Sequence, residues 1–168
     1  MLDISIIEAG VSKLNITNYN LTESLRKTVK RMNALIKHEG YKIDFEYNED
    51  VHILADEVKI TQVFYNLLLN AITHCGGDKT VIVRQSIEEK TVRIEVIDHG
   101  EGIRQEDLPY IWERYYKVDK KHKRPIMGTG LGLSIVKKVM DMHGGQYGVE
   151  SKEGKGSIFW FQIELEAK

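Results

Sequence analysis

Three amide side chains recur at helical spacing in the first half of the chain. Gln62, Asn66 and Asn70 are four residues apart, which places them on one stripe of a helix expected over 56–74. Apolar residues fill most other positions of this helix, so the pattern predicts that the helix is buried. Each buried amide needs a partner, because an unpaired one costs roughly 1–3 kcal/mol. Bonds to neighbouring backbone are one interpretation; a polar pocket, whose amide oxygens suit Mg²⁺ beside a phosphate, is the other.

A second cluster follows an apolar strand expected over 91–97. Asp98 comes directly after this strand and opens the order Asp-His-Gly-Glu-Gly. A carboxylate only accepts hydrogen bonds, so it suits an exocyclic amine such as that of adenine and repels the carbonyl of guanine. Gly100 and Gly102 allow another surface to approach closely. An ordinary Asp-x-Gly turn without a ligand is the alternative.

A glycine-rich segment, 128–133, opens the last expected helix, which covers 130–143. Its sequence, Gly-Thr-Gly-Leu-Gly-Leu, presents backbone N–H groups to an anion at a helix N-terminus. The spacing fits neither a P-loop nor a dinucleotide-binding fingerprint, whose third glycine would stand where the chain has Leu133. A glycine-rich loop without a ligand is the alternative.

A basic segment, 117–124, precedes these glycines. It contains Lys117 and, within 120–124, four further Lys or Arg residues, in a chain whose net charge is −1. Such a run is usually a solvated loop. Beside a phosphate-binding helix it would instead act as a mobile lid that supplies cations to a nucleotide.

The composition limits the classes of protein to which these clusters can belong. The 168 residues correspond to about one domain. With 24 Lys and Arg against 25 Asp and Glu, the chain has no global electrostatic reason to bind nucleic acid or an anionic membrane. An apolar content of 42% predicts one core, and the lone Cys75 excludes an intrachain disulfide and a Cys-rich zinc site. No apolar run approaches the roughly 20 residues of a membrane-spanning helix, and no signal peptide is recognisable, so we expect an intracellular chain.

Alternating and helical patterns predict the elements that position the clusters. Asn20 and Glu23 form a capping box for a helix that ends at Gly40, and a short helix is expected over 108–116. Strands are expected over 41–47, 51–55, 80–86 and 91–97, the last two joined by a turn at 88–89, and two more around 153–156. We therefore expect an α+β fold, a two-layer sandwich with a mixed sheet and three long helices on one face. Residues 2–10 are interpreted as the end of a helix that begins upstream.

Together these residues resemble the catalytic, ATP-binding domain of bacterial sensor histidine kinases, which has the Bergerat fold shared with gyrase, Hsp90 and MutL. The resemblance rests on five motifs in order along about 20–165: an N box at 62–71, a G1 box at 98–103, an F box at 111–119, a G2 box at 128–133, and a last glycine motif at 154–157.

The resemblance implies a role for each motif. Asn70 is implied as the Mg²⁺ ligand, with Asn66 near the same phosphates, Asp98 as the partner of the adenine amine, and Lys117 as a contact of the terminal phosphates. The implied ATP-binding residues are Asn66, Asn70, Thr73, His74, Asp98, Gly100, Gly102, Ile103, Tyr116, Lys117, Gly128, Thr129, Gly130, Leu131, Gly132 and Leu133. Thr73 departs from the Lys that many members carry at this position.

The residue at position 66 separates two kinds of chemistry. In hydrolysing relatives a Glu four residues before the Mg²⁺ ligand activates water, and Asn66 cannot act as a base. We therefore expect phosphoryl transfer to a protein histidine. None of the six histidines has the His-Glu/Asp-x-x-x-Pro context of the acceptor, so we expect no catalytic residue in this chain and no self-labelling. Residues 1–18 are expected to end the dimerisation domain and its linker, and 19–168 to form the catalytic domain.

The implied cofactors are ATP and Mg²⁺. The implied partners are the dimerisation and phosphoacceptor domain of the same protein, within a homodimer, and a response-regulator receiver domain, with no nucleic acid. We expect a cytoplasmic location; whether the full-length protein is anchored in the inner membrane stays open. The alternatives are a serine kinase of the anti-sigma-factor type, a degenerate nucleotide-binding regulatory module and a gyrase-like ATPase.

Overall fold

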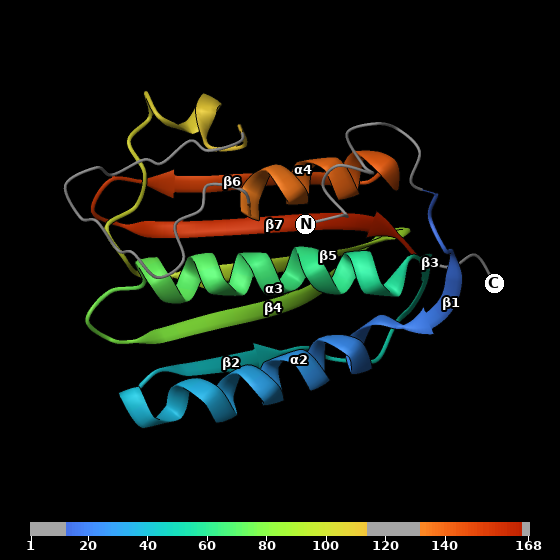
Figure 1. The fold of residues 1–168 in the computed structure, drawn as a ribbon, viewed down its shortest axis with the longest axis horizontal. Helices are drawn as coiled ribbons and strands as arrows, with labels where there is room; N and C mark the ends of the chain where they lie inside the picture. Colours follow the sequence, from blue (N-terminus) through green and yellow to red (C-terminus); the bar gives the residue numbers. More distant parts are fainter. Residues whose placement is uncertain (1–12, 114–131, 166–168) are drawn as a thin grey trace.

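Three helices cover one face of a five-stranded sheet in the computed structural model, which describes residues 13–113 and 132–165 (Figure 1). The helices are α2 (Leu21–Ile36), α3 (Glu57–His74) and α4 (Gly132–Met142). The sheet contains β2 (Lys42–Glu46), β4 (Thr80–Glu88), β5 (Thr91–Asp98), β6 (Gln146–Lys152) and β7 (Gly156–Glu164). Two short 3₁₀ helices cover Lys37–Glu39 and Leu108–Tyr110. The expected α+β two-layer sandwich is confirmed.

The sheet is mixed, as predicted, with strand order β2-β4-β5-β7-β6. β2 and β4 are parallel, and α3 lies in the connection between them, which fits the crossover that parallel neighbours require. The other three pairs are antiparallel. The turn between β4 and β5 falls at 89–90, one residue later than predicted, and Glu89 has a φ of 53° there. This register places Asp98, the last residue of β5, opposite Ser157 of β7.

A second, two-stranded sheet pairs β1 (Thr17–Asn20) with β3 (His52–Ala55) at one end of the helices (Figure 1). No strand is predicted over 17–20, because these residues show no apolar alternation. The strand is stabilised instead by its antiparallel pairing with β3, a long-range contact. β1 leads directly into α2, where the Asn20 side chain accepts a hydrogen bond from the Glu23 amide at 2.9 Å, which confirms the predicted cap.

The core lies between the helices and the sheet, as the strand alternation predicts. Phe159, Phe161 and Ile163 of β7 are buried on the helix side, whereas Trp160 is half-buried on the other face. Phe64 of α3 is fully buried against this layer. Burying aromatic and branched side chains in this way is the main stabilising contribution to such a domain.

Two helix predictions are corrected by the structure. α3 is not buried all round, because Val58 is 76% and Tyr65 41% exposed; only the side that faces the sheet and its neighbouring helices is covered. The helix expected over 108–116 is a 3₁₀ turn at Leu108–Tyr110, with Pro109 in its first turn, and 114–116 lie outside the described residues. The predicted helix stub at 2–10 also lies outside them. No helix within the described ranges is long and apolar enough to cross a membrane.

Candidate functional site

The site is centred on Asp98, which ends β5 and is 2% exposed. Its Oδ1 accepts a hydrogen bond from the Gly100 amide at 2.9 Å. Its Oδ2 is buried and has no hydrogen-bond partner among the described residues. Burial raises the pKa of Asp98 from 3.8 to about 6, against the opposing effect of the Gly100 and Ser157 amides and of His99. A buried carboxylate oxygen without a donor suits an amine that approaches from outside.

The turn after Asp98 lies directly against the chain's own backbone. A Cβ at Gly100 would overlap the carbonyl oxygen of His74, the last residue of α3. A Cβ at Gly102, whose φ is +75°, would overlap the carbonyl oxygen of Lys152. The predicted close approach at both glycines is therefore present, and the approaching surfaces are α3 and the β6–β7 hairpin.

Two serines and one amide hold this turn on the hairpin. Ser151 Oγ accepts from the Ile103 amide at 2.8 Å and donates to the Gly156 carbonyl oxygen at 3.0 Å. The Ser157 hydroxyl lies 2.7 Å from Ser151 Oγ and completes the network as a donor. Ile103 is thus fixed at the edge of the site by backbone and hydroxyl groups. Ser151 was missed by sequence analysis, since it lies 48 residues from the amide that it accepts from.

A second missed contact joins the loop after α3 to the same turn. His99 Nδ1 donates to Asp78 Oδ2 at 2.8 Å, and this bond lowers the pKa of Asp78. A Cβ at Gly76 would overlap the carbonyl oxygen of His99. The ends of α3 and β5 are therefore attached to each other both by side chains and by close backbone packing (left side of Figure 1).

The amide stripe of α3 differs from the prediction in its burial. Gln62, Asn66 and Asn70 are half-buried, not buried, because they lie where the covered side of α3 meets its open side. Asn66 Nδ2 donates to the carbonyl oxygen of Gly132 at 3.5 Å, which brings the predicted amide stripe to the start of α4. Its amide oxygen remains oriented away from that bond as an acceptor.

The last turn of α3 carries the other two predicted site residues. Thr73 Oγ1 is buried and, like Asp98 Oδ2, has no hydrogen-bond partner in the described ranges. His74 is exposed, and its backbone packs on Gly100 as described above. Thr73 lies three residues after Asn70, on a neighbouring position of the helix surface.

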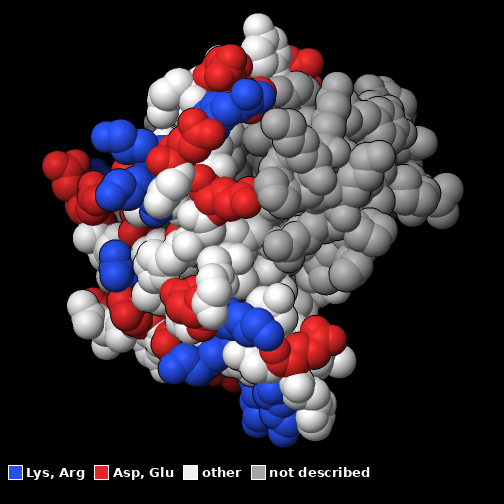
Figure 2. Space-filling view, turned by 90° about the vertical axis from the view of Figure 1, so that its left-hand side faces the viewer, with Lys and Arg blue, Asp and Glu red and all other residues white. Residues whose placement is uncertain are grey.

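The structure describes part of the predicted phosphate segment. Gly132 and Leu133 form the first residues of α4, and both are half-buried. The remaining predicted contacts lie outside the described residues: Tyr116, Lys117, Gly128, Thr129, Gly130 and Leu131. Figure 2 shows the end of the molecule that carries the site, where acidic and basic side chains are interspersed on the described surface.

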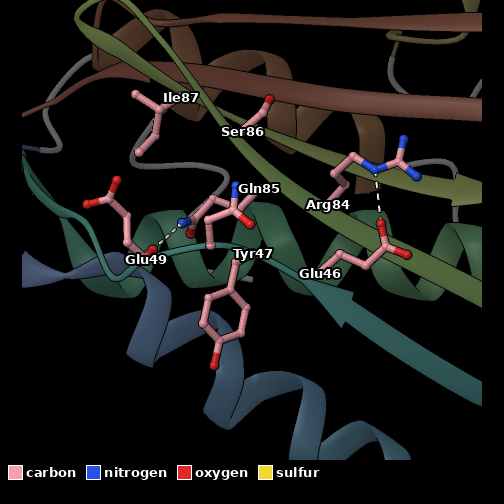
Figure 3. A pocket seen from close by; sticks show the side chains of 8 residues that line it. Glu46, Tyr47, Glu49, Arg84, Gln85, Ser86 and Ile87 are labelled. Carbon is pink, nitrogen blue, oxygen red and sulfur yellow. Dashed lines mark hydrogen bonds and ion pairs between the residues drawn. The ribbon is translucent and has the colours of Figure 1, made fainter.

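A pocket elsewhere contains none of the predicted site residues. It has a volume of about 410 Å³ and lies where β2 and the following loop meet β4 (Figure 3). Its polar groups bond to one another: Gln85 Nε2 donates to the Glu49 carbonyl oxygen at 2.8 Å, and Arg84 Nε donates to Glu46 at 3.0 Å. These pairings distinguish it from the Asp98 site, where a buried acceptor lacks a partner.

The chain matches the model of a known protein family. The family described as "Histidine kinase-, DNA gyrase B-, and HSP90-like ATPase" matches residues 55–167, a range that includes α3, the Asp98 turn and α4. The chain belongs to this family. Within it, the chain is 33% identical over 162 residues to the sensor histidine kinase WalK of Bacillus subtilis, which covers 91% of this chain and 26% of WalK.

A second curated relative is also a sensor protein. The phosphate regulon sensor protein PhoR of Haemophilus influenzae is 33% identical over 143 residues, which cover 85% of this chain and 33% of PhoR. The chain thus spans about a quarter to a third of the length of these curated relatives.

Solved structures show the same domain. The catalytic domain of histidine kinase ThkA has a TM-score of 0.76 and 30% identity, covering 89% of this chain and 95% of that one. Full-length ShkA in complex with AMPPNP has a TM-score of 0.84 and 26% identity, covering 99% of this chain and 35% of ShkA. The chain is the ATP-binding catalytic domain of a sensor histidine kinase, as the resemblance implied.

Proposed function

We propose that this kinase domain binds ATP with Mg²⁺ and transfers the γ-phosphoryl group to a histidine of an upstream dimerisation domain. The observation that carries the proposal is the buried Asp98 Oδ2, which has no partner in the described part of the chain. An adenine amine would supply the donor that this oxygen lacks, whereas the guanine carbonyl would place one acceptor against another. Gly100, Gly102 and Ile103 would shape the rest of the base pocket.

The phosphate end of the site would lie along α3 and the start of α4. Asn66 is bonded to Gly132 through its nitrogen, so its oxygen is available as a hard, neutral ligand, and the oxygen of the half-buried Asn70 would be a second one. Within the described ranges no group of three or more His, Cys, Asp or Glu is arranged to hold a metal ion. This fits Mg²⁺ held by one or two amide oxygens together with substrate phosphates, and the ion would neutralise charge that develops on the phosphoryl group.

The half-buried amide at position 66 favours transfer over hydrolysis. Asn66 has no proton-accepting group of useful basicity, so this domain would contribute positioning and charge neutralisation and leave the nucleophile to its partner. Thr73 would donate its buried hydroxyl toward the nucleotide, in place of the Lys common in the family. Residues of the G2 segment, Lys117, Tyr116 and His74 would complete the contacts with the phosphates.

The partners follow from the same proposal. The acceptor histidine would belong to the dimerisation domain of the same protein in a homodimer, with 1–18 as the end of that domain and 19–168 as the catalytic domain. The phosphoryl group would pass to an aspartate of a response regulator in the cytoplasm. The structure of ThkA in complex with response regulator protein TrrA, which has 26% identity and a TM-score of 0.77 to this chain, supports a partner of this kind.

Calorimetric titration with AMPPNP tests the binding half of the proposal. We expect binding that needs Mg²⁺ and exceeds that of the corresponding GTP analogue, and we expect Asp98→Asn to reduce this preference. Transfer of labelled phosphate to a supplied dimerisation domain tests the other half. Absence of binding in the millimolar range contradicts a functional site, and binding without transfer leaves a regulatory nucleotide module.

A further inference from the structure

His143 uses both ring nitrogens at the point where α4 ends and α3 begins. Its Nδ1 lies 2.8 Å from the carbonyl oxygen of Val139, one turn earlier on α4. Its Nε2 accepts a hydrogen bond from the Asp56 amide at 3.1 Å. A carbonyl oxygen only accepts and an amide only donates, so Nδ1 carries the hydrogen and Nε2 carries none. The two contacts therefore require a neutral imidazole in a single tautomer.

The residue at the other end of this bond starts α3. Asp56 is the N-cap: its Oδ1 accepts from the Lys59 amide at 3.2 Å, and its Oδ2 accepts from the Asn15 amide at 2.9 Å. The residue is 6% exposed, so its amide is shielded from water, and loss of the His143 acceptor would leave a buried donor unpaired.

A second bond joins the middle of α3 to the first residue of α4. Asn66, ten residues after Asp56, bonds to Gly132, eleven residues before His143. At a rise of 1.5 Å per residue these separations correspond to about 15 and about 16.5 Å, so the two spans match along antiparallel helices. The His143 bond and the Asn66 bond together fix the register of α4 on α3.

We propose that His143 is a positioning residue for the nucleotide. It touches none of the predicted contacts, but Gly132 and Leu133, two of those contacts, are the first residues of α4, so the register of α4 on α3 sets where these two residues stand relative to Asn66 and Asn70. This inference rests on the proposed binding of Mg²⁺-ATP. His143 directly follows Met142, the last residue of α4, and Gly144 follows it with a φ of +67°, which is typical of a helix C-terminus.

Three substitutions in the 168-residue chain separate the two hydrogen bonds. His143→Gln extends an amide oxygen to the position of Nε2 and keeps an acceptor for Asp56. His143→Asn places an amide nitrogen at the position of Nδ1 and keeps the donor to Val139 but not the acceptor. His143→Leu removes both. His38→Asn, at an exposed histidine of the 3₁₀ helix Lys37–Glu39, is the matched control.

Binding of Mg²⁺-AMPPNP is measured for the wild type and all variants at one mildly alkaline pH. We expect about tenfold weaker binding for the Asn and Leu variants, as for the loss of one bond to a buried amide, and near wild-type binding for the Gln and His38→Asn variants. Circular dichroism identifies any variant that fails to fold; the Asn and Gln pair decides the question if the Leu variant does. Imidazole ¹⁵N shifts of the wild type report the tautomer directly, and we expect hydrogen on Nδ1.

Each contrary result has a distinct meaning. Wild-type affinity in the Asn variant, or a Gln variant as weak as the Asn variant, overturns the positioning role while the proposed function stands. Hydrogen on Nε2 overturns the assignment of the two bonds and the role built on it. Absence of nucleotide binding by the wild-type chain overturns the proposed function and the positioning role together.

Discussion

Gly100 lies so close to His74 that a Cβ on the glycine would overlap the histidine's carbonyl oxygen. The turn that follows Asp98 therefore rests on the last residue of α3, the helix that carries Asn66 and Asn70. The parts of the site that we propose to bind the base and the phosphates are separate in sequence, and this contact fixes one against the other. This close contact is possible only because Gly100 has no side chain.

Gly100→Ala is expected to lower the free energy of unfolding by about 1–3 kcal/mol, the usual cost of forcing an extra group into a packed site. The new methyl group would also meet Asp98 Oδ1, so the carboxylate would shift and nucleotide affinity would fall. Gly77→Ala is the matched control: no atom lies within 4 Å of its added Cβ, and we expect a change within about 0.5 kcal/mol. Urea unfolding measures both, and equal effects would contradict the close contact.

Asp98 is expected to make stability depend on pH in a defined direction. Because the folded pKa, about 6, exceeds the usual 3.8, the folded state binds more protons than the unfolded state between these values. The cost of burying the charge is therefore full above about pH 6 and is relieved as pH falls toward 3.8. This difference in pKa corresponds to about 3 kcal/mol.

Asp98→Asn removes that titration. We expect the stability of the variant relative to the wild type to be greater at about pH 7 than at about pH 4, by about 2 kcal/mol, whatever constant cost the amide adds. Urea unfolding of both proteins at the two pH values gives the result. A difference that does not change with pH would show that Asp98 is ionised with an ordinary pKa in the folded domain.

The periodic elements of this domain could be predicted from sequence because their patterns are local. The alternation of Phe159 and Phe161 with Trp160 indicates the buried face of β7, and the Asn20 cap indicates the start of α2. β1 could not be predicted in this way, because Thr17–Asn20 has no alternation and pairs with residues about 35 positions away. The half-exposed amides of α3 were mispredicted because apolar content does not reveal which side of a helix its neighbours leave open.

The site likewise combines residues that a local pattern predicts with contacts that depend on long-range packing. Residue type and spacing predict Asp98 with its glycines, and Asn66 with Asn70, as site residues, and these assignments stay predictions. Other features depend on how β5, α3 and the β6–β7 hairpin pack together: the unpaired Asp98 Oδ2, the His99–Asp78 bond and the Ser151 network. No local sequence pattern predicts that packing.

Ser151 supplies a test of the hairpin's role in the site. Ser151→Ala leaves the Ile103 amide without its acceptor, and we expect a loss of about 1–3 kcal/mol in stability together with weaker nucleotide binding. Ser86→Ala, on β4 beside the pocket of Figure 3, is the control, and we expect little change in either measurement. Thermal unfolding and AMPPNP titration of the two variants check this. A Ser151 variant that loses stability and binds normally would limit the network to a structural role.

Asn70→Asp tests the proposed magnesium site on α3. The substitution keeps the size of a half-buried side chain, so we expect the fold to be unchanged. The added carboxylate would stand beside the triphosphate, and like-charge repulsion should weaken Mg²⁺-dependent AMPPNP binding by about tenfold, or about 1.4 kcal/mol. Gln62→Glu adds the same charge two helical turns earlier on the same stripe and should leave binding nearly unchanged. Titrations with and without Mg²⁺ distinguish the cases, and equal affinities in Asn70→Asp and the wild type would remove Asn70 from the metal site.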